Sequence, residues 1–367
     1  MTRSGQTEST DLLTLALAGM LPGTGGEEIL GCGPIGEMCR RIAVLAAMLA
    51  FAPIGAGVAY LMWGGRGVNM QLPSMDLGPV GIWTSQFDFQ PAAEARKAAA
   101  DLEKLGFGAI WFPESVGRES LTHAGLLLGA TKKIVIATGI ANIYGRDAVT
   151  TAAAQKTLAE AYPGRFLLGL GVSHIPLVEQ IRGHTYGKPV AAMRAYLDGM
   201  DAAPYRAVPP PVKPARVLAA LGPRMLQLAA ERADGAHPYF VPPEHTAQAR
   251  QILGSDRFLA VEQAVVLESD RAKAREIARS HMSLYLTLPN YVSNLRRLGF
   301  SDDDFANGGS DRLVDAIVAC GDITAAINRV RAHQSAGADH VCIQVLPVEP
   351  QALPMPQWRE LASALLG

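Results

Sequence analysis

The sequence predicts a (β/α)₈ barrel, a closed parallel sheet surrounded by helices. From Gly78 onward, short apolar runs alternate with helical patterns, and eight such pairs can be counted. The apolar runs, such as Ile134–Ala137 and Phe166–Leu170, show no polar alternation, which is typical of strands buried on both faces. Eight units in about 290 residues fit a closed barrel better than an open doubly wound sheet.

The predicted elements follow in regular order. Pro91 suits the first position of the first helix, and Gly106 suits the position just past its end. The predicted strands are 79–84, 108–112, 133–139, 166–171, 215–220, 235–240, 258–267 and 339–345. The predicted helices are 91–105, 119–131, 147–161, 188–201, 223–233, 243–253, 322–336 and 356–366.

Composition narrows the class of protein. The chain has 367 residues, a formal net charge of −1 and 49% hydrophobic residues, which suits one large α/β domain with an appendage. No block of like charges indicates a nucleic-acid partner, so a small neutral or anionic ligand is expected. The 4 cysteines are scattered without zinc-site or disulfide spacing, which favours a reducing, cytoplasmic setting.

Residues 1–74 are set apart from the barrel. The uncharged segment 42–63 is long enough to span a bilayer, and a membrane anchor is one interpretation of it. Pro53, Gly55 and Gly57 interrupt this segment, however, and alanine and glycine carry little transfer free energy.

We expect residues 1–74 to be a disordered extension or the product of a start codon upstream of the native one. Met70 and Met75 both precede the first convincing strand. The barrel domain is therefore predicted to span 75–367, with an insertion at about 269–321. That insertion is longer than an ordinary connection, so it forms either a functional lid or partner surface, or a solvated helical excursion.

Candidate functional residues lie directly after the predicted strands, because active sites of such barrels form at the carboxyl ends of the strands. Gly169 and Gly171 are expected to let the backbone pass close to a flat ligand. His174 could be a proton donor, a substrate contact or a packed loop residue. Glu114 either accepts a hydrogen bond from a ligand or forms a salt bridge with Arg118 or Arg146.

Gly222-Pro-Arg-Met225 opens a predicted helix, where free N–H groups could bind a phosphate and Arg224 could add positive charge. No G-x-S-x-G turn indicates a serine nucleophile. The histidines fall on different loops without a neighbouring carboxylate, so no metal site is predicted.

Several motifs carry a family resemblance. They are Gly78-Pro-Val-Gly-Ile-Trp83, Leu105-Gly-Phe-Gly-Ala-Ile-Trp-Phe112, Tyr162-Pro-Gly-Arg165 before Gly169-Leu-Gly-Val-Ser-His174, the run 221–235 with His237-Pro-Tyr239, and Gly337-Ala-Asp-His-Val-Cys-Ile-Gln344. At these residues the chain resembles the bacterial luciferase-like monooxygenase superfamily. Within it, the chain is similar to the branch of actinobacterial oxidoreductases that depend on the deazaflavin coenzyme F-420. The resemblance covers about residues 76–367.

The resemblance implies a TIM barrel of the luciferase-like type and a cofactor cleft at its mouth. Glu114 would stand near the deazaflavin ring, with Ser115 in place of a histidine common in relatives. Gly139 and Ile140 would form a bulge, often with a non-proline cis peptide, that backs the ring, with Asn142 just beyond it. The cofactor's ribityl and phosphate part would contact two segments, Gly171, Val172, Ser173 and His174, and Gly222, Pro223, Arg224 and Met225.

The resemblance further implies hydride transfer between F-420 and a small organic substrate, with His174 and Glu114 as catalytic candidates and a homodimer as the assembly. A monooxygenase that uses FMN is the alternative within the family. A non-redox barrel enzyme would need a lysine or metal ligand at a strand end, and the sequence offers none there. A membrane-attached binding protein would rest on segment 42–63.

Overall fold

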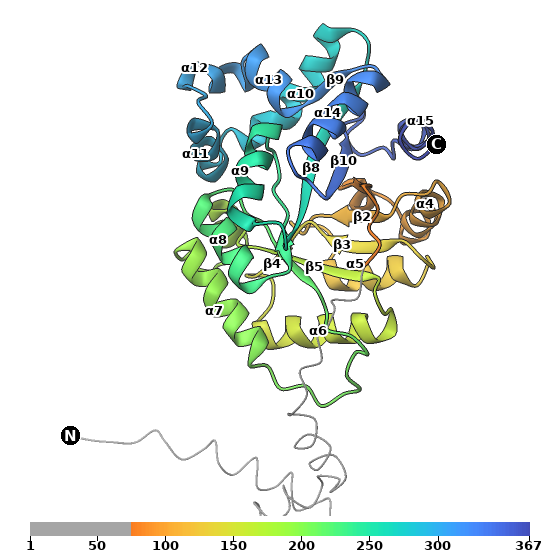
Figure 1. Ribbon diagram of the computed structural model, residues 1–367, viewed down its shortest axis with the longest axis vertical. Helices are drawn as coiled ribbons and strands as arrows, with labels where there is room; N and C mark the ends of the chain where they lie inside the picture. The colour runs from red at the N-terminus through yellow and green to blue at the C-terminus, as the bar shows by residue number, and fades with distance from the viewer. Residues whose placement is uncertain (1–74) are drawn as a thin grey trace, which may run out of the picture. The chain divides into compact units, whose positions relative to one another are not determined.

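The computed structural model describes residues 75–367, and the predicted extension, including segment 42–63, lies outside the described residues. Eight parallel strands close into a barrel, because β10 pairs with both β1 and β8 (Figure 1). The barrel strands are β1 Val80–Trp83, β2 Ala109–Phe112, β3 Val135–Thr138, β5 Phe166–Gly171, β6 Arg216–Leu218, β7 Gly235–Ala236, β8 Phe258–Leu267 and β10 His340–Val345. The predicted (β/α)₈ barrel is confirmed.

Helices surround the barrel in the predicted order. They are α4 Ala92–Lys104, α5 Ser120–Leu128, α6 Ala148–Ala161, α7 Pro189–Asp201, α8 Pro223–Arg232, α9 Pro243–Leu253, α14 Ile323–Ser335 and α15 Met355–Leu365. Two short elements that the sequence pattern did not predict are the 3-10 turn η1 Gln86–Phe89 and the π-helical turn η2 Pro176–Ile181. Within residues 75–367, no helix combines the length and the apolar character needed to cross a membrane.

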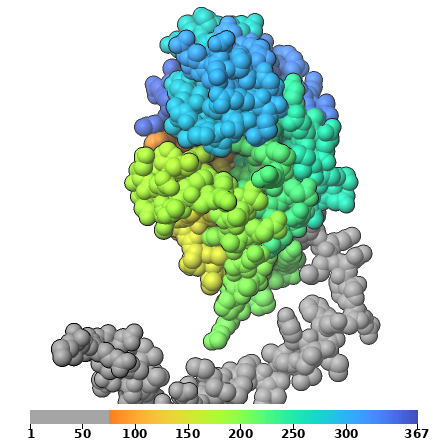
Figure 2. Space-filling model, turned by 90° about the vertical axis from the view of Figure 1, so that its left-hand side faces the viewer, coloured from red at the N-terminus to blue at the C-terminus, as the bar shows by residue number. Residues whose placement is uncertain are grey.

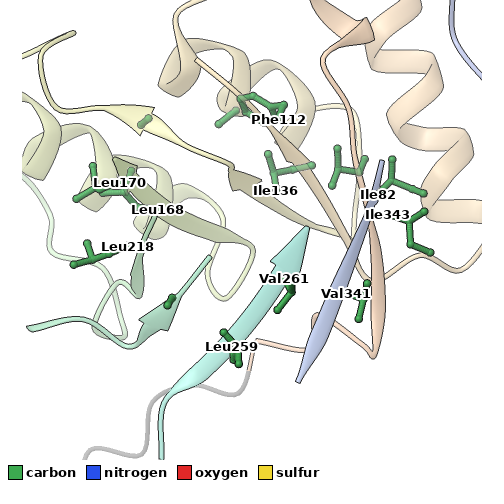
Figure 3. Close-up of a cluster of buried hydrophobic side chains, with 14 of the residues drawn as sticks. Ile82, Phe112, Ile136, Leu168, Leu170, Leu218, Leu259, Val261, Val341 and Ile343 are labelled. Atoms are coloured by element: carbon green, nitrogen blue, oxygen red, sulfur yellow. The ribbon is translucent and has the colours of Figure 1, made fainter. Parts of the chain in front are cut away.

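Both faces of the strands are buried, which explains their uninterrupted apolar sequences. Figure 3 shows the outward-facing layer, which packs against the helices and includes Ile82, Ile136, Leu168, Val261 and Ile343. The alternate residues point inward and fill the barrel; among them are Trp83, Trp111, Ala137, Val217 and Cys342. Burying apolar surface contributes about 25 cal/mol per Å², so this two-layer core supplies the main stabilisation of the fold.

The strands predicted at 133–139 and 235–240 are among those that are shorter than predicted, because the backbone leaves the sheet near the barrel mouth. The third ends at Thr138, a cis Gly139–Ile140 peptide follows, and the short strand β4 Ala141–Asn142 then pairs with β5. The strand predicted at 235–240 ends at Ala236. Phe240 has a left-handed φ of 60°, and its N–H donates to Oε2 of Glu262 at 3.0 Å.

The segment between β8 and α14 is mainly helical, as predicted. It contains α10 Arg271–Tyr285, α11 Pro289–Arg297, α12 Asp302–Phe305, the 3-10 turn η3 Ala306–Gly308, α13 Asp311–Ile317 and the strand β9 Ala319–Gly321. These helices gather at one end of the barrel (Figure 1). A second hydrophobic cluster, including Phe240, Met282, Tyr291, Leu295 and Leu313, holds them against the extended end of β8.

The buried histidines make stability depend on pH. Burial, aided by the charge of Arg118, lowers the pKa of His123 to about 4 from 6.5, and neither ring nitrogen has a partner among the described residues. The unfolded chain binds a proton below pH 6.5 that the folded chain excludes until about pH 4. The neutral ring therefore contributes its full share to the free energy of unfolding above pH 6.5. That free energy falls by about 1.4 kcal/mol per pH unit as the pH drops from 6.5 towards 4.

We expect His123→Phe to stabilise the protein, and by about 1 kcal/mol more at pH 5.5 than at pH 7.5. Urea unfolding at the two pH values measures this difference. His333→Phe is the matched control and should destabilise at pH 7.5, because the ring nitrogens of His333 bond to Thr246 and Gln263 at 2.8 Å each. An equal effect of His123→Phe at both pH values would contradict the explanation.

Candidate functional site

A cavity of about 200 Å³ opens at the carboxyl ends of β5, β6 and β7. Figure 2 shows the blue segment of α11 to α13 directly above the green segments, with a narrow hollow where they meet. The cavity is lined by Ile140, Gly171, Val172, Ser173, His174, Tyr186, Pro189, Ala219, Ala220, Leu221, Gly222, Met225, His237, Tyr239, Asn290 and Tyr291. The barrel and the insertion therefore both build its walls.

The structure brings most of the predicted cofactor residues together around this cavity. Those that line it are Ile140, Gly171, Val172, Ser173, His174, Gly222 and Met225. The others lie elsewhere. Pro223 and Arg224 are exposed, Asn142 is fully buried, and Glu114 lines a separate cavity. Gly139 is the neighbour of Ile140 in the cis peptide and is not itself among the residues that line the cavity.

The loop after β5 is held in place by contacts from Tyr186 and from α11. Ser173 has a left-handed φ of 58°, and the Tyr186 hydroxyl donates to its carbonyl oxygen at 3.2 Å. A hydrogen bond joins the side chains of His174 and Asn290, and the His174 ring centroid lies 5.6 Å from that of Tyr291. Burial lowers the pKa of His174 from 6.5, and the bond to Asn290 opposes that shift. The ring is therefore neutral near pH 7.

Gly169 in the Gly169-Leu-Gly171 motif serves a different purpose from the one predicted. A Cβ atom on Gly169 would lie 2.0 Å from the carbonyl oxygen of Thr138, whose hydroxyl also donates to the Gly169 carbonyl at 2.8 Å. A Cβ atom on Gly171 would lie 2.4 Å from the Ile140 side chain. The interpretation that these glycines admit a ligand is wrong for Gly169, because this residue lets β5 approach the β3 segment.

The Gly139–Ile140 segment forms the inner wall of the cavity. Its peptide bond is cis, as the resemblance implied. The Trp83 indole N–H donates to the Gly139 carbonyl oxygen at 3.1 Å, and the Glu114 backbone N–H donates to the Ile140 carbonyl oxygen at 3.1 Å. Bonds from β1 and from the loop after β2 therefore fix this wall.

Glu114 forms the predicted salt bridge with Arg146. Its carboxylate also accepts the backbone N–H of Asn142 at 2.7 Å and that of Ser120 at 3.2 Å. Arg118, the other predicted partner, donates to backbone carbonyls of the η1 segment instead. Of the two predicted alternatives for Glu114, the structure shows the salt bridge, and the carboxylate ties the loops after β2 and β3 together.

The N-terminus of α8 borders the cavity and lies beside a cation that the sequence did not identify. Gly222 is the N-cap and Pro223, which has no N–H, is the first helical residue. The Met225 N–H donates to the Gly222 carbonyl oxygen at 3.1 Å, so the Arg224 N–H is the free backbone donor of this first turn. A Cβ atom on Gly222 would lie 3.5 Å from Nη2 of Arg297, which comes from α11 and is exposed like Arg224.

Sequence reasoning assigned no site role to the residues that the insertion contributes, whereas His237 and Tyr239 stood out in the motif His237-Pro-Tyr239. Asn290 and Tyr291 stood out only as polar and aromatic residues in a long connection. Tyr239 lies between the cavity and the insertion. Its hydroxyl donates to Gln344 Oε1 at 2.9 Å and lies 2.9 Å from the hydroxyl of Tyr285. No pattern in the sequence predicts such contacts, because their partners are more than 40 residues apart.

Comparison with known proteins identifies the family. The sequence profile of the luciferase-like monooxygenase family matches residues 70–340. A Mycobacterium tuberculosis protein assigned provisionally as a coenzyme F-420-dependent oxidoreductase is 25% identical in a 320-residue alignment that covers 70% of this chain and 92% of that protein.

Two solved structures show the same fold. The F-420-dependent tetrahydromethanopterin reductase of Methanopyrus kandleri has a TM-score of 0.62 at 18% identity, covering 77% of this chain and 96% of the reductase. The oxygenating component of a Pseudomonas putida diketocamphane monooxygenase, solved with FMN, has a TM-score of 0.59 at 14% identity, covering 77% and 95%. With a matched profile over most of its length and this barrel, the chain belongs to the luciferase-like monooxygenase family.

Proposed function

We propose that this protein is an oxidoreductase that transfers a hydride between coenzyme F-420 and a small organic substrate. The proposal rests on the cavity at the carboxyl ends of β5 to β7. Ile140 lines its inner wall, and the start of α8, with Arg297 beside it, borders the cavity. The relative from Mycobacterium tuberculosis supports F-420 as the cofactor by its assigned name.

The residues of the cavity fit the two chemically different parts of such a cofactor. Ile140, Val172 and Tyr239 offer apolar and aromatic surface to a flat ring. The free backbone N–H of Arg224 at the start of α8, together with the Arg297 guanidinium, suits a phosphate. When bound, F-420 supplies the carbon centre that accepts or gives the hydride.

His174 suits the transfer of a proton to or from the substrate. Nδ1 has no partner among the described residues, and the bond to Asn290 orients the ring. Because burial keeps the imidazole neutral near pH 7, it can accept the hydroxyl proton of an alcohol while the hydride leaves the carbon that bears that hydroxyl. In the reverse direction, protonated His174 returns that proton to the carbonyl oxygen.

An FMN-dependent monooxygenase is the second candidate function. The specific observation in its favour is the barrel shared with the diketocamphane monooxygenase, which binds FMN. Both cofactors combine a flat tricyclic ring with a phosphate, so the cavity walls alone fit either one.

A fluorescence titration of the full chain with F-420 and with FMN distinguishes the two candidates. We expect F-420 to bind at least about tenfold more tightly, a difference of about 1.4 kcal/mol. Tighter binding of FMN would favour the monooxygenase, and binding of neither cofactor would overturn the proposed function.

Removing the cation beside α8 should weaken binding of the cofactor's phosphate. We expect Arg297→Gln to raise the F-420 dissociation constant about tenfold, because a charge-assisted hydrogen bond contributes about 1.5–3 kcal/mol. Arg224→Gln is the matched control, because it removes an equally exposed guanidinium from the first turn of α8 itself. Isothermal titration at low salt measures both. A larger effect of Arg224→Gln would show that the phosphate lies elsewhere.

Replacing His174 should slow turnover without releasing the cofactor. We expect His174→Asn to lower kcat by about 10² or more and to change F-420 affinity by less than about threefold. The assay follows reduction of F-420 with the most active alcohol from a panel of small alcohols. Unchanged turnover would assign His174 to packing. Above its lowered pKa, the wild-type rate of alcohol oxidation should no longer increase with pH.

A further inference from the structure

His237, on the loop after β7, has one occupied and one free ring nitrogen. Nδ1 lies 3.0 Å from the carbonyl oxygen of Ala260. Because a carbonyl can only accept, Nδ1 carries the hydrogen and Nε2 carries a lone pair. Nε2 has no hydrogen-bond partner among the described residues, and the side chain is 1% exposed. The ring therefore presents a buried, unpaired acceptor.

The position of this acceptor is fixed, and it adjoins the inner wall of the cavity. His237 lines the cavity together with Ile140 and Tyr239. Its ring stacks on Trp111 with centroids 4.5 Å apart and planes 14° apart. A Cβ atom on Gly139 would lie 3.0 Å from Nε2, so glycine at that position leaves room beside this buried acceptor.

The indole and hydroxyl donors near the ring are engaged with other acceptors, and the Cys342 thiol lies 3.9 Å from Nδ1, the other ring nitrogen. The Trp83 indole N–H donates to the Gly139 carbonyl oxygen at 3.1 Å. The Trp111 indole N–H donates to Nε2 of His340 at 3.2 Å, and the Tyr239 hydroxyl donates to Gln344. Burial also lowers the pKa of His237 to about 4, so the ring stays neutral at physiological pH. Nothing in the described protein can satisfy this nitrogen.

We propose that Nε2 of His237 accepts a hydrogen bond from a ring N–H of the bound cofactor. This inference rests on the proposed function. The pyrimidine ring of deazaflavins and flavins carries an imide N–H, which is the donor that a neutral imidazole recognises. His237 thereby selects a flat ring with an N–H at its inner edge and fixes which edge enters the barrel. This selection applies to F-420 and FMN alike.

The test compares ligands that differ only in this donor. The probes are 5-deaza-FMN and its imide N-methyl derivative, each titrated against the full chain by displacement of F-420. We expect the wild-type chain to prefer the N–H probe about tenfold or more, because an unpaired buried polar group is costly. His237→Phe, which keeps the stacking on Trp111, should reduce the preference to about twofold or less, since only the steric effect of the methyl group remains.

His237→Gln is the rescue variant, because a carboxamide oxygen can also accept and should restore part of the preference. Urea unfolding of each variant confirms that it is folded, and the wild-type comparison needs no variant at all. Equal binding of the two probes to the wild-type chain, or an undiminished preference in His237→Phe, would overturn the role of His237 while leaving the proposed function in place. Failure of 5-deaza-FMN to displace bound F-420 would overturn the ring site itself. Binding of neither F-420 nor FMN would overturn both proposals.

Discussion

Closure of the parallel sheet is the constraint on which the rest of the structure depends. β10 pairs with β1 on one side and with β8 on the other, so no strand edge is left open in the barrel. Since all the strands run in the same direction, every loop at a carboxyl end reaches the same mouth. Ile140, His174, Gly222 and His237 are far apart in the sequence, yet this closure places them around one cavity.

Closure also removes water from the inside of the barrel, and this burial determines the protonation state of the ionisable side chains there. Burial raises the pKa of Glu262 to about 8 and lowers that of His340 to about 4, so both are neutral near pH 7. Glu262 accepts the N–H of Phe240 and thereby holds the left-handed turn that follows Tyr239. A neutral buried acid thus helps to shape the wall of the candidate site.

The sequence proposed candidate site residues from strand order, but it could not assign the direction of their side chains. The loop 172–174 and Gly222 were found because they come directly after apolar strands. Glu114 and Arg224 have suitable chemistry and suitable sequence positions. The Glu114 carboxylate, however, pairs with Arg146, and the Arg224 side chain is exposed to solvent. Arg297 lies more than 70 residues beyond Gly222, and only the packing of α11 brings its guanidinium there.

By itself the sequence determined the class of fold, because burial on both faces leaves uninterrupted apolar strands that local composition records. It also determined the order of the elements and, through its motifs, the resemblance to the family. Only the tertiary structure decided that Gly169 accommodates the Thr138 carbonyl, that α11 covers the cavity, and that Nε2 of His237 lacks a partner. These features depend on distances between residues remote in the chain, and such distances are set by the closed barrel and not by local propensity.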